Sequence, residues 1–129
     1  MPHPILVIED NAANRELLSS LLEAHGYGVI QATTAQSGID LARSAAPQLI
    51  LMDLSLPGMS GLEATRQLKS DPGTTHVPVI AVSAHAFDKD RAAAMAAGCC
   101  GFITKPIDTR RMIVEIAGIL RTHRLEGTP

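Results

Sequence analysis

The sequence predicts an α/β protein: a doubly wound, five-stranded parallel sheet with five helices distributed over both faces. Short apolar runs alternate with longer segments whose apolar residues recur at helical spacing. The alternation is repeated five times and takes up almost all of the 129 residues, which indicates one domain. Three of the apolar runs end directly at charged side chains, as expected where parallel strands reach the ligand-binding edge of a sheet.

The first strand is expected at residues 5–8, and leucines at helical spacing follow it. This first helix should begin after Asn11 and end at Gly26, because glycine commonly terminates helices. Residues 27–32 predict the second strand. Thr34 can then cap a second helix by accepting a hydrogen bond from its first turn.

Pro47 ends the second helix, because proline cannot continue it. The third strand is expected at residues 49–52 and is followed by a loop, residues 54–61, that is rich in Pro, Gly and Ser. A third helix comes next, with apolar residues up to Leu68. The fourth strand, residues 79–82, follows a short polar loop.

The last two repeats begin with an alanine-rich helix at residues 89–97. The fifth strand is expected at residues 101–104, and Asp108 can cap a last helix that carries one apolar face. The domain is therefore expected to cover residues 1–124. Residues 125–129 are expected to form a flexible tail.

Composition excludes several classes of function. The formal net charge is −2 and the chain has no run of basic residues, so we expect no direct contact with nucleic acid. No stretch is long enough to cross a bilayer, and the start of the chain lacks the layout of a signal peptide, so we expect no membrane partner. The two cysteines are adjacent and cannot link distant segments. A cytoplasmic location is the simplest expectation.

Charged side chains follow three of the expected strands. Glu9 and Asp10 follow the first strand, Asp53 follows the third, and Lys105 follows the fifth. Because the carboxyl ends of parallel strands share one edge of a sheet, these side chains should lie close together. Three acids and one lysine suggest a divalent cation beside an acceptor carboxylate, with an ammonium group ready to hold phosphate.

The acids point to Mg²⁺ as the cofactor. Clustered carboxylates repel one another, so Glu9, Asp10 and Asp53 would destabilise the fold without a compensating cation. Mg²⁺ suits such a place, because it prefers oxygen ligands and takes one or two carboxylates together with water and phosphate. Alternatively, Glu9 and Asp10 are ordinary loop residues, and Asp10 or Asn11 caps the helix that follows.

Four further observations suggest phosphate chemistry. A carboxylate such as Asp53 can attack phosphorus and form an aspartyl phosphate. Lys105 is a compact cation suited to a phosphate oxygen, and Pro106 is a candidate for a cis peptide bond that would aim the lysine into the site. Ser83 ends the fourth strand and can donate a hydrogen bond to a new phosphoryl oxygen. The alternative interpretations are structural: an acid in a turn, a surface lysine and a turn serine.

Four stretches of the chain resemble the receiver domains of two-component response regulators. They are ILVIEDNAANRELL, LILMDLSLPGMSGLE, VIAVSAHA and AGCCGFITKPID, and they occur in the family's order over about the whole chain. The resemblance implies a flavodoxin-like sheet with strand order 2-1-3-4-5. The segment EDNAANRELL is also similar to receivers of phosphorelays and hybrid kinases, and to small stand-alone regulators of cell division.

The resemblance also implies roles for the acids. Asp53 corresponds to the phosphoacceptor of the family. Asp10 corresponds to a direct Mg²⁺ ligand and Glu9 to an acid that acts mainly through water. The backbone carbonyl of Ser55 corresponds to the remaining protein ligand of the metal.

Three more roles follow from the same resemblance. Lys105 corresponds to the phosphate-binding lysine, Ser83 to the hydroxyl switch and Phe102 to the aromatic residue whose rotation accompanies activation. The chain departs from the common pattern at two places. Phe102 lacks the hydroxyl of the tyrosine found in many members, and the acidic pair Glu9–Asp10 replaces the commoner Asp–Asp.

The leading hypothesis is a single-domain response regulator that is not an enzyme beyond its own phosphorylation and dephosphorylation. Its expected phosphoryl donor is the phosphohistidine of a sensor histidine kinase or a histidine phosphotransferase. Its expected downstream partner is a protein effector, bound through the fourth helix, fifth strand and fifth helix. A monomer or a phosphorylation-dependent dimer is expected.

Three alternatives remain open on the sequence. The chain can be an unphosphorylated protein-binding module on a receiver scaffold, or a receiver domain excised from a hybrid histidine kinase. It can also be a phosphohydrolase with an aspartyl nucleophile. Such enzymes usually place a second acid two residues after the nucleophile, where this chain has Ser55.

Overall fold

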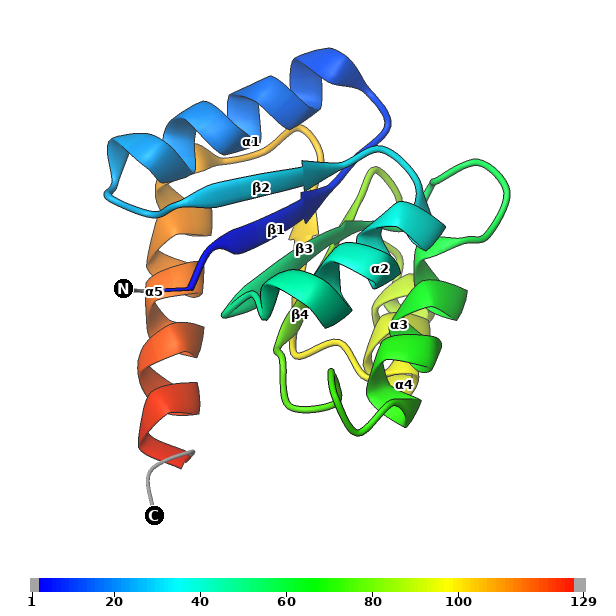
Figure 1. Cartoon of the computed structure of the whole chain (residues 1–129). Helices are drawn as coiled ribbons and strands as arrows, with labels where there is room; N and C mark the ends of the chain where they lie inside the picture. The colour runs from blue at the N-terminus through cyan, green and yellow to red at the C-terminus, as the bar shows by residue number, and fades with distance from the viewer. Residues whose placement is uncertain (1–2, 127–129) are drawn as a thin grey trace.

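The computed structural model describes residues 3–126 and has the architecture that the sequence predicts (Figure 1). One parallel sheet has the strand order β2-β1-β3-β4-β5. Its elements in chain order are β1 (Ile5–Ile8), α1 (Ala12–Ala24), β2 (Val29–Ala32), α2 (Ala35–Ala45), β3 (Leu49–Asp53), α3 (Gly61–Ser70), β4 (Val79–Ser83), α4 (Asp88–Ala97), β5 (Gly101–Thr104) and α5 (Thr109–Glu126). The predicted flavodoxin-like fold is confirmed.

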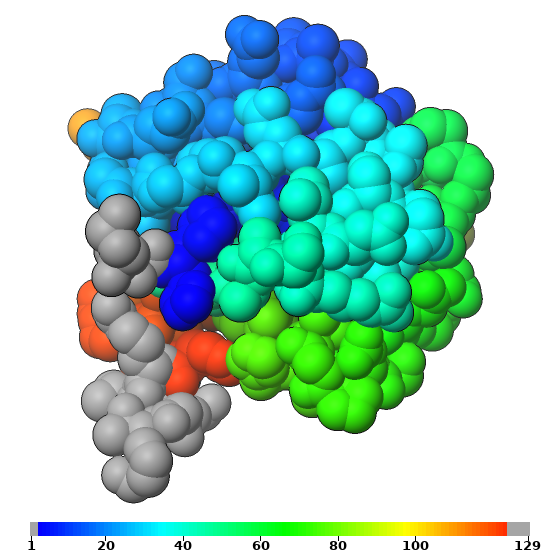
Figure 2. All heavy atoms as spheres, viewed as in Figure 1, coloured from blue at the N-terminus to red at the C-terminus, as the bar shows by residue number. Residues whose placement is uncertain are grey.

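The sheet separates two apolar layers. Side chains alternate along β1, so Leu6 and Ile8 pack with α2, α3 and α4, whereas Ile5 and Val7 pack with α1 and α5. These four side chains are at most 1% exposed. Burial on both faces explains why the strands read as continuous apolar runs. Figure 2 shows that helices make up much of the visible surface, with little of β1 in view.

The predicted strand boundaries shift by one or two residues. Strand β2 begins at Val29, because the N–H of Tyr27 donates to the carbonyl of Leu22 (3.1 Å) and completes the end of α1. Strands β3 and β4 each extend one residue beyond the expectation, to Asp53 and Ser83. These two polar residues are therefore held by the sheet itself.

The two predicted helix caps are confirmed. The side chain of Thr34 accepts a hydrogen bond from the N–H of Ser37 (3.1 Å), and that of Asp108 accepts one from the N–H of Arg111 (3.1 Å). Each cap satisfies an amide that the first turn of a helix leaves free.

Helices α4 and α5 are longer than predicted. Helix α4 begins at Asp88, one residue early, and α5 runs to Glu126, so residues 125 and 126 of the expected flexible tail are helical. Residues 127–129 lie outside the described residues, and the division at residue 124 remains a prediction. In residues 3–126, none of the helices combines the length and apolarity needed to cross a membrane.

Gly61 lets α3 start directly against the end of β3. A Cβ atom at this position would lie 2.8 Å from the Cα of Leu54 and would also press on the carbonyl oxygen of Asp53. Both obstacles are backbone atoms, so neither can rotate away. The absence of a side chain at Gly61 thus keeps the backbone of Asp53 in place.

We predict that Gly61→Ala lowers the free energy of unfolding by about 1–3 kcal/mol, because the added methyl group forces backbone shifts. The matched control is Gly118→Ala in α5, where an added Cβ meets nothing within 4 Å. That variant should gain about 0.5–1 kcal/mol from helix propensity. Urea unfolding measures both, and equal effects of the two variants would contradict the steric explanation.

Candidate functional site

The register of the sheet brings the predicted site residues to one edge. Ile8 of β1 pairs with Met52, Asp53 of β3 pairs with Val82, and Ser83 of β4 pairs with Thr104. The residues that end or follow these strands therefore lie next to one another. Glu9, Lys105 and the other predicted side chains reach this edge because parallel strands all end there.

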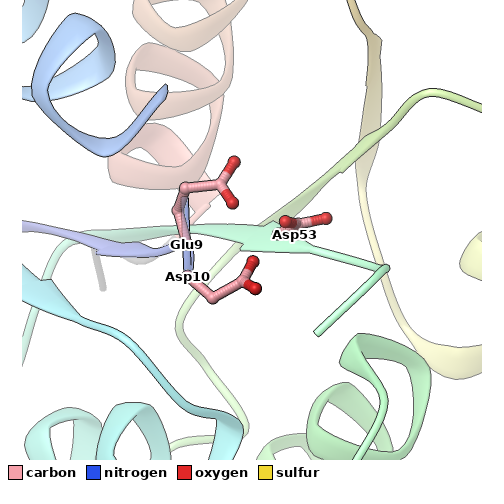
Figure 3. A group of neighbouring side chains, drawn as sticks. All are labelled: Glu9, Asp10 and Asp53. Atoms are coloured by element: carbon pink, nitrogen blue, oxygen red, sulfur yellow. The ribbon is translucent and has the colours of Figure 1, made fainter. Parts of the chain in front are cut away.

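The three acids converge. Figure 3 shows the carboxylates of Glu9 and Asp10, from the end of β1, turned toward that of Asp53 at the end of β3. One oxygen of each lies within 4.8 Å of the others. Glu9 is 1% exposed and Asp53 is 3% exposed, whereas Asp10 is exposed to solvent. The cluster thus has a buried side and an open side.

Lys105 supplies the positive charge at the buried side. Its Nζ lies 3.0 Å from Oε1 of Glu9 and donates a hydrogen bond to Oδ2 of Asp53 at 3.3 Å. One ammonium group therefore contacts the two buried carboxylates at once. Burial makes this arrangement important, because an unpaired carboxylate in such a place is strongly destabilising.

Backbone amides hold the other carboxylate oxygens. Oδ1 of Asp53 accepts a hydrogen bond from the N–H of Ser55 (2.9 Å), and Oε2 of Glu9 accepts one from the N–H of Asn11 (3.2 Å). Both donors lie two residues after the acid, in the turn that follows the strand. The turns therefore orient the carboxylates as well as reverse the chain.

The pKa values of the cluster move apart. Burial raises the pKa of Glu9 to about 7, hydrogen bonding with Asp53 adds to the rise, and Lys105 opposes it. Burial also acts to raise the pKa of Asp53, but Glu9, the Ser55 amide and Lys105 together lower it below the usual value. Burial acts to lower the pKa of Lys105, and the two carboxylates raise it. Near neutral pH, Asp53 is ionised and Lys105 is charged, while Glu9 titrates.

The donor set fits Mg²⁺. Oε1 of Glu9 is buried and accepts no hydrogen bond of good geometry from the described residues, although Lys105 lies beside it. This oxygen, together with the converging oxygens of Asp10 and Asp53, favours a hard cation. The exposed side at Asp10 leaves room for the water ligands that Mg²⁺ retains. The ligand role of the Ser55 carbonyl remains a prediction.

The other predicted residues lie close by in the fold. Ser83 is 3% exposed, and its Oγ accepts a hydrogen bond from the N–H of His85 (3.0 Å). Phe102 lies in β5 and is 8% exposed. The peptide bond between Lys105 and Pro106 is cis. The switch roles of Ser83 and Phe102 remain predictions.

Sequence analysis missed two arginines. Arg15, on α1, donates from Nη1 to the carbonyls of Glu9 (3.0 Å) and Asp10 (3.4 Å) and braces the turn that carries both acids. Arg91, on α4, lies over the ring of Phe102, with Cζ 4.8 Å from the ring centroid. Neither directly follows a strand, and Arg91 is one of four consecutive charged residues at the start of α4, so the sequence alone did not single out these contacts.

We predict that, in metal-free buffer, Glu9 makes the protein less stable as the pH rises from about 4.5 to about 7. The folded protein holds the Glu9 proton up to about pH 7, whereas the unfolded chain releases it near 4.5. The folded state therefore binds more protons within this window, and the free energy of unfolding falls by up to about 3 kcal/mol across it.

Urea unfolding at several pH values measures this decline in the free energy of unfolding. Glu9→Gln should remove the decline, because glutamine does not titrate. Glu63→Gln, at an exposed position of α3, is the control and should keep it. A decline that persists in Glu9→Gln would show that another group is responsible.

Comparison with known proteins assigns the family. The model of the response regulator receiver domain matches residues 5–117. The chain is 43% identical over 120 residues to the polar-differentiation response regulator DivK of Brucella anthropi, which covers 93% of this chain and 98% of that protein. DivK of Brucella ovis is 42% identical over 120 residues, and this alignment also covers 93% of this chain and 98% of the relative.

Solved structures agree with this match. A CheY-like receiver domain protein from Methanospirillum hungatei has a TM-score of 0.91 at 27% identity, over 98% of this chain and all of the other. The receiver domain of the sensor histidine kinase PA1611 from Pseudomonas aeruginosa was solved with magnesium in its active-site cleft. It has a TM-score of 0.81 at 30% identity, and the match covers 95% of this chain and 97% of the other. The chain therefore belongs to the response regulator receiver domains of two-component signalling.

Proposed function

We propose that this receiver domain accepts a phosphoryl group on Asp53 and passes the signal on by binding another protein. The donor is the phosphohistidine of a sensor histidine kinase or of a histidine phosphotransferase, and the reaction depends on Mg²⁺. The observation that carries the proposal is the placement of Asp53. It is a nearly buried carboxylate that faces a lysine and two further acids.

The surroundings of Asp53 suit a nucleophile. Its lowered pKa keeps the carboxylate ionised, and the hydrogen bond from the Ser55 amide to Oδ1 fixes its orientation. In the proposed transfer, a carboxylate oxygen forms a bond to phosphorus while the bond from phosphorus to the histidine nitrogen breaks. A positioned carboxylate lowers the barrier because little orientational freedom is then lost.

The charge of the incoming group needs cations. Lys105 already lies at 3.3 Å from Oδ2 of Asp53, where it can bind a phosphoryl oxygen. Asp10, Asp53 and the Ser55 carbonyl would hold Mg²⁺, with Glu9 acting mainly through water. When bound, the metal supplies positive charge that stabilises the phosphoryl oxygens and shields the acids from one another.

Ser83 and Phe102 connect this chemistry with a change of shape. The hydroxyl of Ser83 can donate to a phosphoryl oxygen on Asp53, and the ring of Phe102 can move into the space that Ser83 leaves. Such movements remodel the surface formed by α4, β5 and α5. We assign this surface to the downstream protein effector.

The apolar residues on that surface support the assignment. Met95 of α4 is 47% exposed and Val114 of α5 is 72% exposed, and both line one surface hollow together with Phe102 of β5. We propose a cytoplasmic protein that is a monomer or a phosphorylation-dependent dimer and makes no direct contact with nucleic acid or membrane.

The alternatives are less well supported. Members of this family are phosphoacceptors and signalling modules rather than classical enzymes, and Ser55 stands where a phosphohydrolase needs its second acid. An unphosphorylated binding module has no need of the buried acids and Lys105, which are costly to keep. A receiver from a hybrid histidine kinase has one observation in its favour, the 30% identity to the PA1611 receiver domain.

We predict that Asp53→Asn abolishes phosphorylation. Phosphoramidate, whose P–N bond resembles that of phosphohistidine, serves as the donor, and mass spectrometry detects a hydroxylamine-sensitive phosphoryl adduct on the intact protein. Asp40→Asn, at an exposed position of α2, is the control and should label like the wild type. Full labelling of Asp53→Asn would refute the assignment of the acceptor.

We predict that Lys105→Met slows this phosphorylation by about a hundredfold, because a preorganised charge is lost from the transition state. Lys89→Met, at an exposed position of α4, is the matched control and should react at the wild-type rate. The circular dichroism spectrum and melting of each variant establish that it is folded. A wild-type rate in folded Lys105→Met would exclude the lysine from the transfer step.

A further inference from the structure

The cation–π contact between Arg91 and Phe102 links α4 to β5. The guanidinium carbon of Arg91 lies over the aromatic ring, 4.8 Å from its centroid. At this distance the positive charge is attracted to the negative face of the ring. The stem of the arginine can at the same time cover apolar surface.

The ring needs such a cover because α4 has few large side chains. The helix contains the sequence DKDRAAAMAA, and its buried residues are Ala94 and Ala97. Methyl groups fill little of the space above β5, so they cannot enclose an aromatic ring by themselves. Phe102 is nevertheless only 8% exposed. Arg91, an exposed residue of α4, lies over the ring.

The contact also lies beside open space and near the functional edge of the sheet. Arg91 and Phe102 line a pocket together with Thr104, Pro106 and Arg111. Along β5, Phe102 is two residues before Thr104, which pairs with Ser83 of β4. The ring therefore has room nearby, and it is close in the sheet to the proposed hydroxyl switch.

We propose that Arg91 is a positioning residue for Phe102. Its guanidinium group holds the ring packed against β5 and thereby ties α4 to that strand. The consequence for signalling rests on the proposed function above, because it takes Phe102 as the aromatic switch. Removing the contact changes the equilibrium between the packed ring and the displaced ring of Phe102 by about two- to fivefold, as expected for a cation–π pair near solvent.

The composition of the chain offers a direct probe. Phe102 and Phe87 are its two phenylalanines, and Phe87 is 69% exposed. Protein labelled with para-fluorophenylalanine should give one fluorine NMR signal for each ring, and Phe87→Leu assigns them. The change of each signal between H₂O and D₂O reports the exposure of its ring, with Phe87 as the internal reference.

Three variants separate the contact from other effects of α4. Arg91→Ala should enlarge the solvent isotope shift of Phe102 toward that of Phe87, whereas Arg91→Lys should retain part of the protection because it keeps a cation. Lys89→Ala, the exposed control, should change neither signal. Alanine is the best helix former, so a change in Arg91→Ala does not come from loss of the helix. An unchanged Phe102 signal in Arg91→Ala would overturn the positioning role.

Titration with beryllofluoride and Mg²⁺ tests the link to signalling. The Phe102 signal should respond in the wild type and not in Asp53→Asn. In Arg91→Ala, the apparent affinity for beryllofluoride should differ from the wild type by about two- to fivefold. Equal affinities would overturn the link. If the Phe102 signal of the wild type does not change on addition of beryllofluoride, the proposed function is contradicted. The solvent isotope shifts measured without beryllofluoride still decide whether Arg91 positions the ring.

Discussion

One ammonium group between two buried carboxylates is the interaction on which the site depends. Lys105 reaches both Glu9 and Asp53, which the sheet places side by side at its edge. Without that charge, two acids that are almost excluded from solvent would repel each other in a poorly solvated place. Their separated pKa values show how the cluster accommodates this cost: Asp53 stays ionised, and Glu9 holds a proton up to about pH 7. Asp53, the proposed acceptor, is thus kept ionised.

Close backbone packing maintains this geometry. Gly61 allows α3 to meet the end of β3, and the amides of Asn11 and Ser55 hold the carboxylates of Glu9 and Asp53. Helix α4 differs, because its buried residues are alanines. Close backbone packing therefore holds the acids, whereas the surface assigned to the effector includes a helix whose buried side chains are small. The proposed switching requires this division, since the chemistry needs fixed geometry and the signal needs movement.

Membership of the receiver family explains why such a small domain contains so many charged groups at one edge. The similarity to DivK and the magnesium-bound PA1611 receiver domain places the chain among proteins of two-component signalling. The details that distinguish this chain lie around the shared residues. Glu9 stands in the acidic pair, Phe102 replaces the commoner tyrosine, and Arg15 and Arg91 contact the loop and the ring.

The sequence by itself determined the fold class, the order of the elements and the set of residues at the strand ends. It could do so because burial on both faces makes parallel strands read as apolar runs, and because such strands all end at one edge. Strand ends were off by a residue or two where hydrogen bonds decide them, as at Tyr27. Only the tertiary structure decided the contacts of Lys105, the raised pKa of Glu9 and the cover that Arg91 forms over Phe102. These depend on distances between segments far apart in the chain and on exclusion of water, and neither is encoded in local spacing.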